Sequence, residues 1–215
     1  MITQNIVLKV ETEDPAKEAI TKAASAIKVG RVIAFPTRCL YALGTDAFNA
    51  AAVERIFKIK QRAAQNPILI LIDHVKQLER LVTCVSDVAA EIMQAFWPGK
   101  VTLVFEASDT VPHDLAGGSG KIGIRLAGHP IASALVRAVA SPITGTSANL
   151  SGSPGCHRIA DLESQITSQL DLILDAGPLK GGIGSTVVDV TEENRPKILR
   201  EGEISARDIM NLFGD

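Results

Sequence analysis

The segment FKIKQR, residues 57–62, places three cationic side chains within six positions. It stands between an amphipathic pattern typical of a helix and the strongly apolar stretch PILILI, which begins at Pro67. Lys60 supplies a compact positive charge and Arg62 a planar fork of N–H donors, and proteins use both groups to hold phosphate oxygens. The pair therefore indicates phosphate binding. The alternative is a solvated helix end, where the helix dipole favours cations.

Other loops also combine small polar residues with cations or glycines: PTRCLYALG, KIKQRAAQNP, TGTSANLSGSPG, GGIGSTVVD and LREGE. Hydroxyl and amide groups such as those of Ser147 and Asn149 can orient a ligand, and the glycines of GGIGST let backbone N–H groups approach an anion. Each loop alone is also compatible with a surface turn. Since all of them adjoin predicted strands or helices, they can meet at one edge of a sheet, and together they predict a nucleotide or polyphosphate site.

Common nucleotide and metal motifs are missing from the sequence. In LAGGSGKIG, Leu115 stands where a phosphate loop of the form GxxxxGK[ST] requires its first glycine, and Ile122 replaces the hydroxyl residue after Lys121. Cys156 and His157 are adjacent, but zinc needs more ligands than these two. We therefore expect no protein-bound metal, and any phosphate chemistry must use another scaffold.

The pattern of apolar residues predicts an α/β protein with a mixed sheet and helices packed against it, because short Val- and Ile-rich runs alternate with longer patterns of period 3.6. One helix is expected within residues 13–30, with Asp14 as N-cap, Pro15 at the first helical position and Gly30 as the stop. Further helices are predicted at 49–60, 86–97 with Ser86 as cap, 129–140, and after Ser205. Strands are predicted at 31–36, 67–72, 101–105, 121–126, 171–177, 185–190 and 197–200.

Length and composition favour one globular domain spanning residues 1–215. The chain is 46% hydrophobic and 21% charged, which suits a single sizeable core. Its net charge of -2 does not favour nucleic acid or an anionic membrane as a partner, so any basic site must be local. No apolar run approaches the roughly 18 to 20 residues of a membrane span, and the start MITQNIVLKV lacks a secretion signal. We expect a soluble, cytoplasmic protein.

In their order along the chain, these loops resemble the family of threonylcarbamoyl-AMP synthases, the YrdC and Sua5 type of domain. The matching stretches are FPTRCLYALGTDAFN, AVERIFKIKQR, NPILIL, FWPGKVTLVF, IGIRLAGHPIASAL, GTSANLSGSPG, GSTVVDV and LREGEIS. The resemblance implies an open, twisted α/β fold around a large basic-lined cavity. It also implies a nucleotidyltransferase that makes threonylcarbamoyl-AMP and pyrophosphate from ATP, L-threonine and bicarbonate, with Mg²⁺ accompanying ATP. A downstream tRNA threonylcarbamoyl transferase complex would then modify adenosine 37 of tRNA.

The resemblance also assigns roles to individual residues. Lys60 and Arg62 match the family's KxR signature and are expected to hold the triphosphate as the catalytic cations. The other residues expected at ATP are Asn66, Lys121, Ser147, Asn149 and Arg200. Those expected at threonine are Thr37, Arg125 and Ser185.

Two departures from the family pattern concern the threonine end of the site. Arg38 follows Thr37 where most members carry an acidic residue, and Leu71 stands where a histidine is frequent. One alternative is therefore a YciO-type paralogue with an acceptor other than threonine, although members of that branch tend to lose the KxR and SAN signatures that this chain retains. The other alternative is a protein that binds double-stranded RNA or tRNA. With only 4% aromatic residues, the base stacking that usually drives such binding would be weak.

Overall fold

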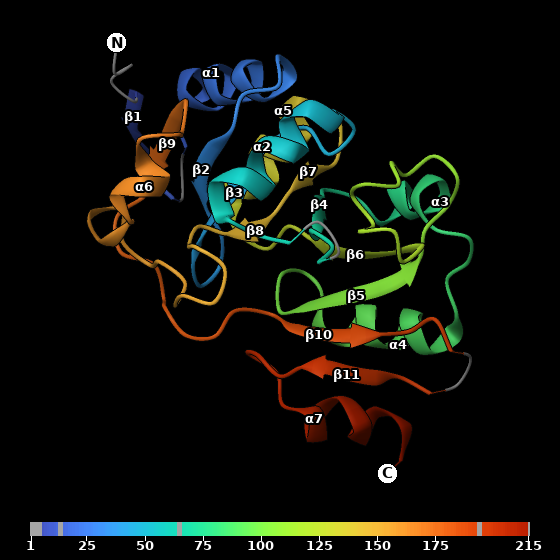
Figure 1. Ribbon diagram of the computed structural model, residues 1–215. Helices are drawn as coiled ribbons and strands as arrows, with labels where there is room; N and C mark the ends of the chain where they lie inside the picture. Colours follow the sequence, from blue (N-terminus) through green and yellow to red (C-terminus); the bar gives the residue numbers. More distant parts are fainter. Residues whose placement is uncertain (1–5, 13–14, 64–65, 193–194, 215) are drawn as a thin grey trace.

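The structure is a computed structural model that describes residues 6–12, 15–63, 66–192 and 195–214. Its strands form two mixed sheets (Figure 1). The five-stranded sheet has the order β1 (Ile6–Lys9), β9 (Leu172–Asp175), β2 (Ile33–Pro36), β3 (Tyr41–Gly44) and β8 (Thr146–Ser147). The six-stranded sheet has the order β11 (Lys197–Arg200), β10 (Thr186–Asp189), β5 (Val101–Glu106), β6 (Lys121–Leu126), β4 (Ile70–Ile72) and β7 (Ile143–Thr144).

The helices of the described residues agree in position with the helices expected from the sequence, and short ones are added. The α-helices are α1 (Lys17–Lys28), α2 (Ala50–Lys60), α3 (Leu78–Leu81), α4 (Asp87–Phe96), α5 (Pro130–Val139), α6 (Ser164–Thr167) and α7 (Ala206–Met210). Single 3₁₀ turns are η1 (Val75–Gln77), η2 (Ile159–Asp161) and η3 (Asn211–Phe213). The predicted caps Ser86 and Ser205 accept hydrogen bonds from backbone N–H groups, as expected of N-caps. The α/β class is confirmed.

One predicted helix boundary was wrong, and four strands were not predicted. The first helix begins at Lys17 with Ala16 at the N-cap position, so Pro15 is not its first residue, and Asp14 lies outside the described residues. Strands β1, β3, β7 and β8 were not predicted. All four are short, with four residues each in β1 and β3 and two each in β7 and β8, which leaves too few positions for an alternation to be detected.

The two sheets are joined at Gly145, which separates β7 of one sheet from β8 of the other. The Gly145 N–H donates to the carbonyl of Leu69 at 3.0 Å. A Cβ atom at Gly145 would lie 2.7 Å from Cγ of Leu71, so only glycine allows the crossing strand to pass this close to β4. Residues of both sheets can therefore face one shared space.

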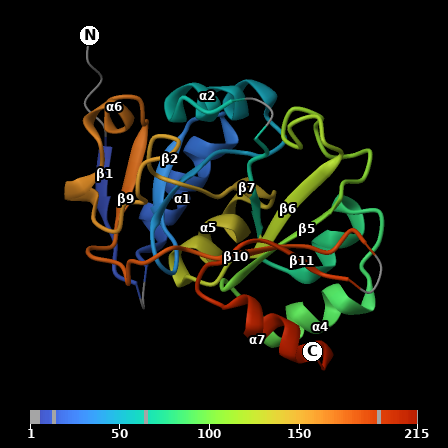
Figure 2. The same cartoon turned by 60° about the horizontal axis from the view of Figure 1, so that its bottom comes forward.

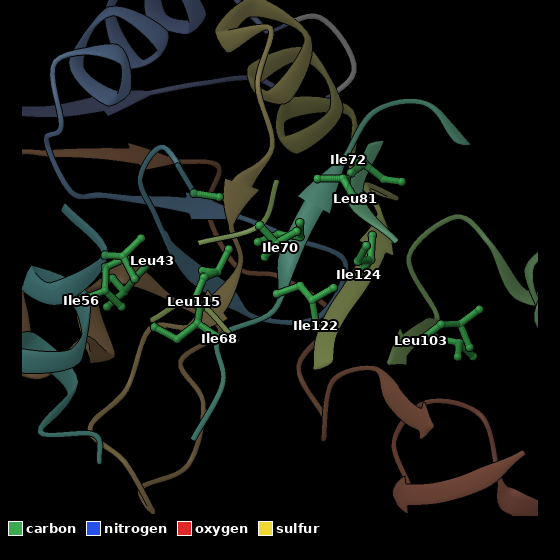
Figure 3. Packing of buried hydrophobic residues seen from close by; sticks show 14 of the residues in the cluster. Leu43, Ile56, Ile68, Ile70, Ile72, Leu81, Leu103, Leu115, Ile122 and Ile124 are labelled. Atoms are coloured by element: carbon green, nitrogen blue, oxygen red, sulfur yellow. The ribbon is translucent and has the colours of Figure 1, made fainter. Parts of the chain in front are cut away.

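Two apolar clusters stabilise this arrangement. In one, α1 packs against α5, and both helices contact β2 (Figures 1 and 2). The other contains residues of α2 and α4 together with residues of β4, β5 and β6, among them Ile70, Leu103 and Ile124 (Figure 3). Strand β4 is buried on both sides, as predicted, because Ile70 and Ile72 belong to one cluster and Leu71 to the other. The loops at the strand ends thus extend from a rigid frame.

Candidate functional site

A cavity of about 910 Å³ is lined by residues from both sheets. All ten site residues predicted from the sequence line it: Thr37, Lys60, Arg62, Asn66, Lys121, Arg125, Ser147, Asn149, Ser185 and Arg200. Among the described residues of its wall, the cations are Arg38, Lys60, Arg62, Lys121, Arg125 and Arg200, and the acidic residue is Asp189. The volume lies within the range of small-molecule pockets, and the excess of positive charge suits an anionic ligand.

Lys60 is almost completely buried, with 1% of its surface exposed. Its Nζ donates to the backbone carbonyls of Ser147 and Asn149, at 2.7 Å in the second case. Burial, with the nearby Arg62 charge adding to it, lowers the pKa of Lys60 to about 8. Because an ammonium group has three N–H donors, one donor remains available. Lys60 thus fixes the loop after β8 and keeps a positive charge beneath it.

Arg62 enters the cavity because α2 ends in a left-handed turn at Gln61, where φ is 50° and ψ is 42°. The N–H groups of Gln61 and Arg62 donate to the carbonyls of Lys58 and Phe57, the pattern of a Schellman motif. The Arg62 guanidinium then donates to the carbonyls of Asn66 and Pro67, both at 3.0 Å. Burial and the charge of Arg200 lower its pKa. Arg62 is therefore held by neutral partners and forms no ion pair with any residue that the structure describes.

The TSAN loop is held by its own side chains as well as by Lys60. The hydroxyl of Ser147 donates to Oδ1 of Asn149, and Nδ2 of Asn149 donates to the carbonyls of Leu150 and Ser153 at 2.7 and 2.6 Å. The amide of Asn149 is therefore used internally and shapes the loop. Backbone groups and the small residues 151–155 are left to form the cavity wall here.

Arg125 is buried on β6, and its Nη1 donates to Oγ of Ser185 at 2.8 Å. The same hydroxyl lies 2.9 Å from Oγ1 of Thr102, and Arg200 donates to the carbonyl of Ser185 at 2.7 Å. Burial, with the charge of Arg200 adding to it, lowers the pKa of Arg125 to about 10. Ser185 thus brings together two guanidinium groups that have no carboxylate partner among the described residues.

Lys121 and Arg38 differ from these cations because each is paired with a carboxylate. Lys121 donates to Asp189 at 3.0 Å and to the hydroxyl of Thr191 at 2.7 Å. Arg38 donates to Glu203 from two nitrogens, at 2.6 and 3.2 Å. Lys121 therefore lies in the cavity, as expected, but most of its charge is balanced by the protein.

Thr37 and Leu71 lie on the part of the wall assigned to threonine. The Thr37 hydroxyl donates to the carbonyl of Leu40 at 2.6 Å, which fixes the turn between β2 and β3. Leu71 lines the cavity next to Gly145 and supplies an apolar part of its wall.

Sequence reasoning did not identify Thr102, Lys180 and Glu203. Thr102 is a fully buried hydroxyl residue in the otherwise apolar run VTLVF, and that interruption was a usable signal. Lys180 and Glu203 carried no such signal, since isolated charges in loops are common. The described residues contain no group of three or more His, Cys, Asp or Glu side chains that could hold a metal ion. Within the same residues, no helix has the length and apolar character needed to cross a membrane.

Fold and site together define an α/β protein with a cationic cavity suited to a phosphorylated ligand. The Sua5/YciO/YrdC family model, described as telomere recombination, matches residues 25–202. The chain belongs to this family.

Individual relatives agree with this assignment. The threonylcarbamoyl-AMP synthase of Pyrococcus abyssi is 36% identical over 193 residues, which are 90% of this chain and 56% of the relative. The chain thus spans little more than half the length of that protein. A crystal structure of P. abyssi Sua5 complexed with L-threonine has a TM-score of 0.92 at 35% identity, covering 98% of this chain and 61% of the other. Escherichia coli YciO has a TM-score of 0.87 at 28% identity, covering 95% and 99%.

Proposed function

We propose that this chain is an L-threonylcarbamoyladenylate synthase, a nucleotidyltransferase that converts ATP, L-threonine and bicarbonate into threonylcarbamoyl-AMP and pyrophosphate. The observation that carries the proposal is the convergence of all ten predicted site residues on one cationic cavity. The product would supply a tRNA threonylcarbamoyl transferase complex that modifies adenosine 37 of tRNA. The names of the P. abyssi synthase and of the threonine-bound Sua5 structure support this choice.

In this proposal, the triphosphate lies beside Lys60, Arg62 and Arg200, whose charges have no carboxylate partner among the described residues. Arg125 and Ser185 receive the threonine carboxylate, and Thr37 contacts the amino acid from the opposite loop. Asn66 and the loop of Ser147 and Asn149 hold the nucleotide, and Lys121 borders it. Mg²⁺ enters as part of the substrate MgATP, and no step depends on a metal bound by the protein.

The chemistry requires alignment more than covalent help from the protein. Threonine's deprotonated amine and bicarbonate form a carbamate with loss of water. A carbamate oxygen then attacks the α-phosphorus, the bond from the α-phosphorus to the bridging oxygen breaks, and pyrophosphate leaves with that oxygen. Negative charge grows on the leaving group, and preorganised cations stabilise it. The positive charges of Lys60 and Arg62 would serve this purpose.

Pyrophosphate release by the purified protein tests the proposal. The assay contains ATP, Mg²⁺ and bicarbonate, with L-threonine, with L-serine, or with no amino acid, and mass spectrometry follows the acyl-adenylate. We expect threonine-dependent release that falls about 100-fold in Arg62→Ala, the usual effect of removing one transition-state donor. Lys58→Ala is the matched control, because Lys58 lies on the same helix but is exposed and paired with Glu54 at 2.7 Å. Release with serine but not threonine would favour the YciO-type alternative.

A further inference from the structure

Glu203 lies behind the cavity wall and binds two cations from different loops. Its carboxylate accepts hydrogen bonds from Arg38 at 2.6 and 3.2 Å and from Lys180 at 2.8 Å. The Glu203 side chain is 14% exposed, whereas those of Arg38 and Lys180 are 32% and 63% exposed. The hydrogen bond from Arg38, aided by Lys180 and opposed by burial, lowers the pKa of Glu203 to about 2. The three residues, here called the Glu203 cluster, remain ionised at neutral pH.

The backbone around Glu203 is bonded to the segment that carries Ser185. The Glu203 N–H donates to the carbonyl of Gly184 at 2.8 Å. The N–H groups of Gly202 and Ile204 donate to the hydroxyl of Thr186 at 2.9 and 3.1 Å. The contact is so close that a Cβ atom at Gly202 would lie 2.3 Å from the carbonyl carbon of Ser185. Any displacement of residues 202–204 would therefore be transmitted to Ser185.

The carboxylate of Glu203 connects this segment to the loop that carries Thr37. Arg38 directly follows Thr37, and its side-chain stem lies against Gly99, where a Cβ atom would meet Cδ of Arg38 at 2.3 Å. The N–H of Gly181 donates to the carbonyl of Cys39 at 2.9 Å, which joins the same two loops a second time. The Glu203 carboxylate thus links three segments: its own, the loop of Arg38 and the loop of Lys180.

From this arrangement we infer that Glu203 is a positioning residue for the amino-acid end of the cavity, acting on Thr37 through Arg38 and on Ser185 through the backbone. The inference rests on the proposed function, in which Thr37 and Ser185 contact threonine. It also assigns a use to Arg38. The guanidinium is directed to Glu203, so an arginine after Thr37 does not place a free positive charge on the amino acid.

The kinetic test compares Glu203→Gln with the matched control Glu54→Gln, which removes an exposed carboxylate paired with Lys58 on α2. Glu203→Gln should raise KM for threonine about tenfold, the factor that corresponds to losing a hydrogen bond between charged groups. KM for ATP should rise by no more than about threefold, since Lys60 and Arg62 do not contact the cluster and Arg200 is linked to it only through the carbonyl of Ser185. The double variant Arg38→Glu/Glu203→Arg should recover part of the threonine affinity that Glu203→Arg loses. An unchanged KM for threonine, equal increases in both KM values, or no recovery in the double variant would each overturn the inference.

Amide hydrogen exchange provides a readout that does not need turnover. In Glu203→Gln, the amides of residues 181–186 and of Thr37 should exchange faster than in the wild type, while those of α2 should not change. If the wild type releases no pyrophosphate with threonine, the proposed function fails, and this measurement still decides whether Glu203 orders both loops. Equal exchange in the wild type and Glu203→Gln would refute the positioning role.

Discussion

Four cations of the cavity wall are bonded to uncharged oxygen atoms, whereas two are paired with carboxylates. The first group is Lys60, Arg62, Arg125 and Arg200. The second group is Arg38, paired with Glu203, and Lys121, paired with Asp189. Both groups line the same cavity, so lining alone does not distinguish a ligand-binding charge from a structural one.

The pKa directions follow this difference. Burial is the largest cause that lowers the pKa of each cation in the first group, because none of them is paired with a carboxylate of the described residues; for Lys60, the charge of Glu163 opposes the effect only in part. The hydrogen bond to Glu203 raises the pKa of Arg38 instead. A bound anionic ligand would offset the free-energy cost of burying these charges, and it would do so in the first group only. We therefore assign ligand charge recognition to the four cations with neutral partners.

The largest effect is expected from Arg125→Met, which replaces a buried charge by an apolar side chain of similar length. Threonine-dependent turnover should fall about 100-fold or more, because the guanidinium beside Ser185 is lost. Stability should be unchanged or higher, since Met removes an uncompensated buried charge and Ser185 keeps its hydrogen bond to Thr102. Steady-state kinetics and thermal unfolding of the same samples check both parts. A lower melting temperature with activity retained would mean that Arg125 is only structural.

A smaller effect is expected from Gly202→Ala, which disturbs the contact between the segment that follows β11 and Ser185 without changing a charge. The new methyl group would lie 2.3 Å from the carbonyl carbon of Ser185, so the backbone around residue 202 must shift. We expect a loss of about 1–3 kcal/mol in the free energy of unfolding, typical of overpacking, together with weaker threonine binding. Urea unfolding and a threonine titration measure the two effects. Gly214→Ala provides the contrast, because no atom lies within 4 Å of a Cβ there and any loss would come from the left-handed backbone, with φ of 83°, and not from a clash.

The pH dependence of Lys60 should have opposite signs for ligand binding and for stability. Its pKa is about 8 in the folded protein, against about 10.4 for an ordinary lysine. Between these values the unfolded chain binds more protons than the folded protein, so the contribution of Lys60 to stability rises with pH. ATP affinity should fall over the same range, since the ammonium loses its charge.

The comparison of wild type with Lys60→Met at about pH 7 and about pH 9.5 isolates this effect. From the lower to the higher pH, the free energy of unfolding of the wild type should increase relative to that of Lys60→Met. Over the same range, the ratio by which the wild type binds ATP more tightly than Lys60→Met should fall several-fold. Lys58→Met, which changes an exposed lysine on the same helix, should show neither trend. A constant difference between pH 7 and 9.5 would contradict a lowered pKa at Lys60.

Much of the frame could be predicted from local sequence signals. Apolar periodicity defined the helix that begins after Asn49, and Ser86 was predicted as the cap of another helix. Ser86 accepts the expected backbone hydrogen bond, and Asn49, which was not named as a cap, accepts one from Ala52. The site loops were identified because hydroxyl residues, glycines and cations recur at element ends. These signals operate over a few residues, which is why they can be read from one sequence.

The partners of the site residues could not be predicted in this way. Lys60 bonds to Asn149, 89 residues away, and Thr102 lies beside Ser185, 83 residues away. Whether a cation is bonded to a carbonyl or to a carboxylate depends on such distant pairings. The sequence analysis therefore predicted ATP binding for both Lys60 and Lys121. The two-residue strands β7 and β8 were missed for a related reason, because their pairing depends on β4 and β3.

Binding of MgATP to Arg62→Ala and Lys121→Ala, measured side by side by calorimetry, tests the central claim most directly. Both residues line the cavity and both substitutions remove one positive charge, but Arg62 is bonded to carbonyls and Lys121 to Asp189. We predict that Arg62→Ala weakens binding at least about tenfold and that Lys121→Ala weakens it by no more than about threefold. Equal losses, or a larger loss in Lys121→Ala, would contradict the distinction between the two groups of cations.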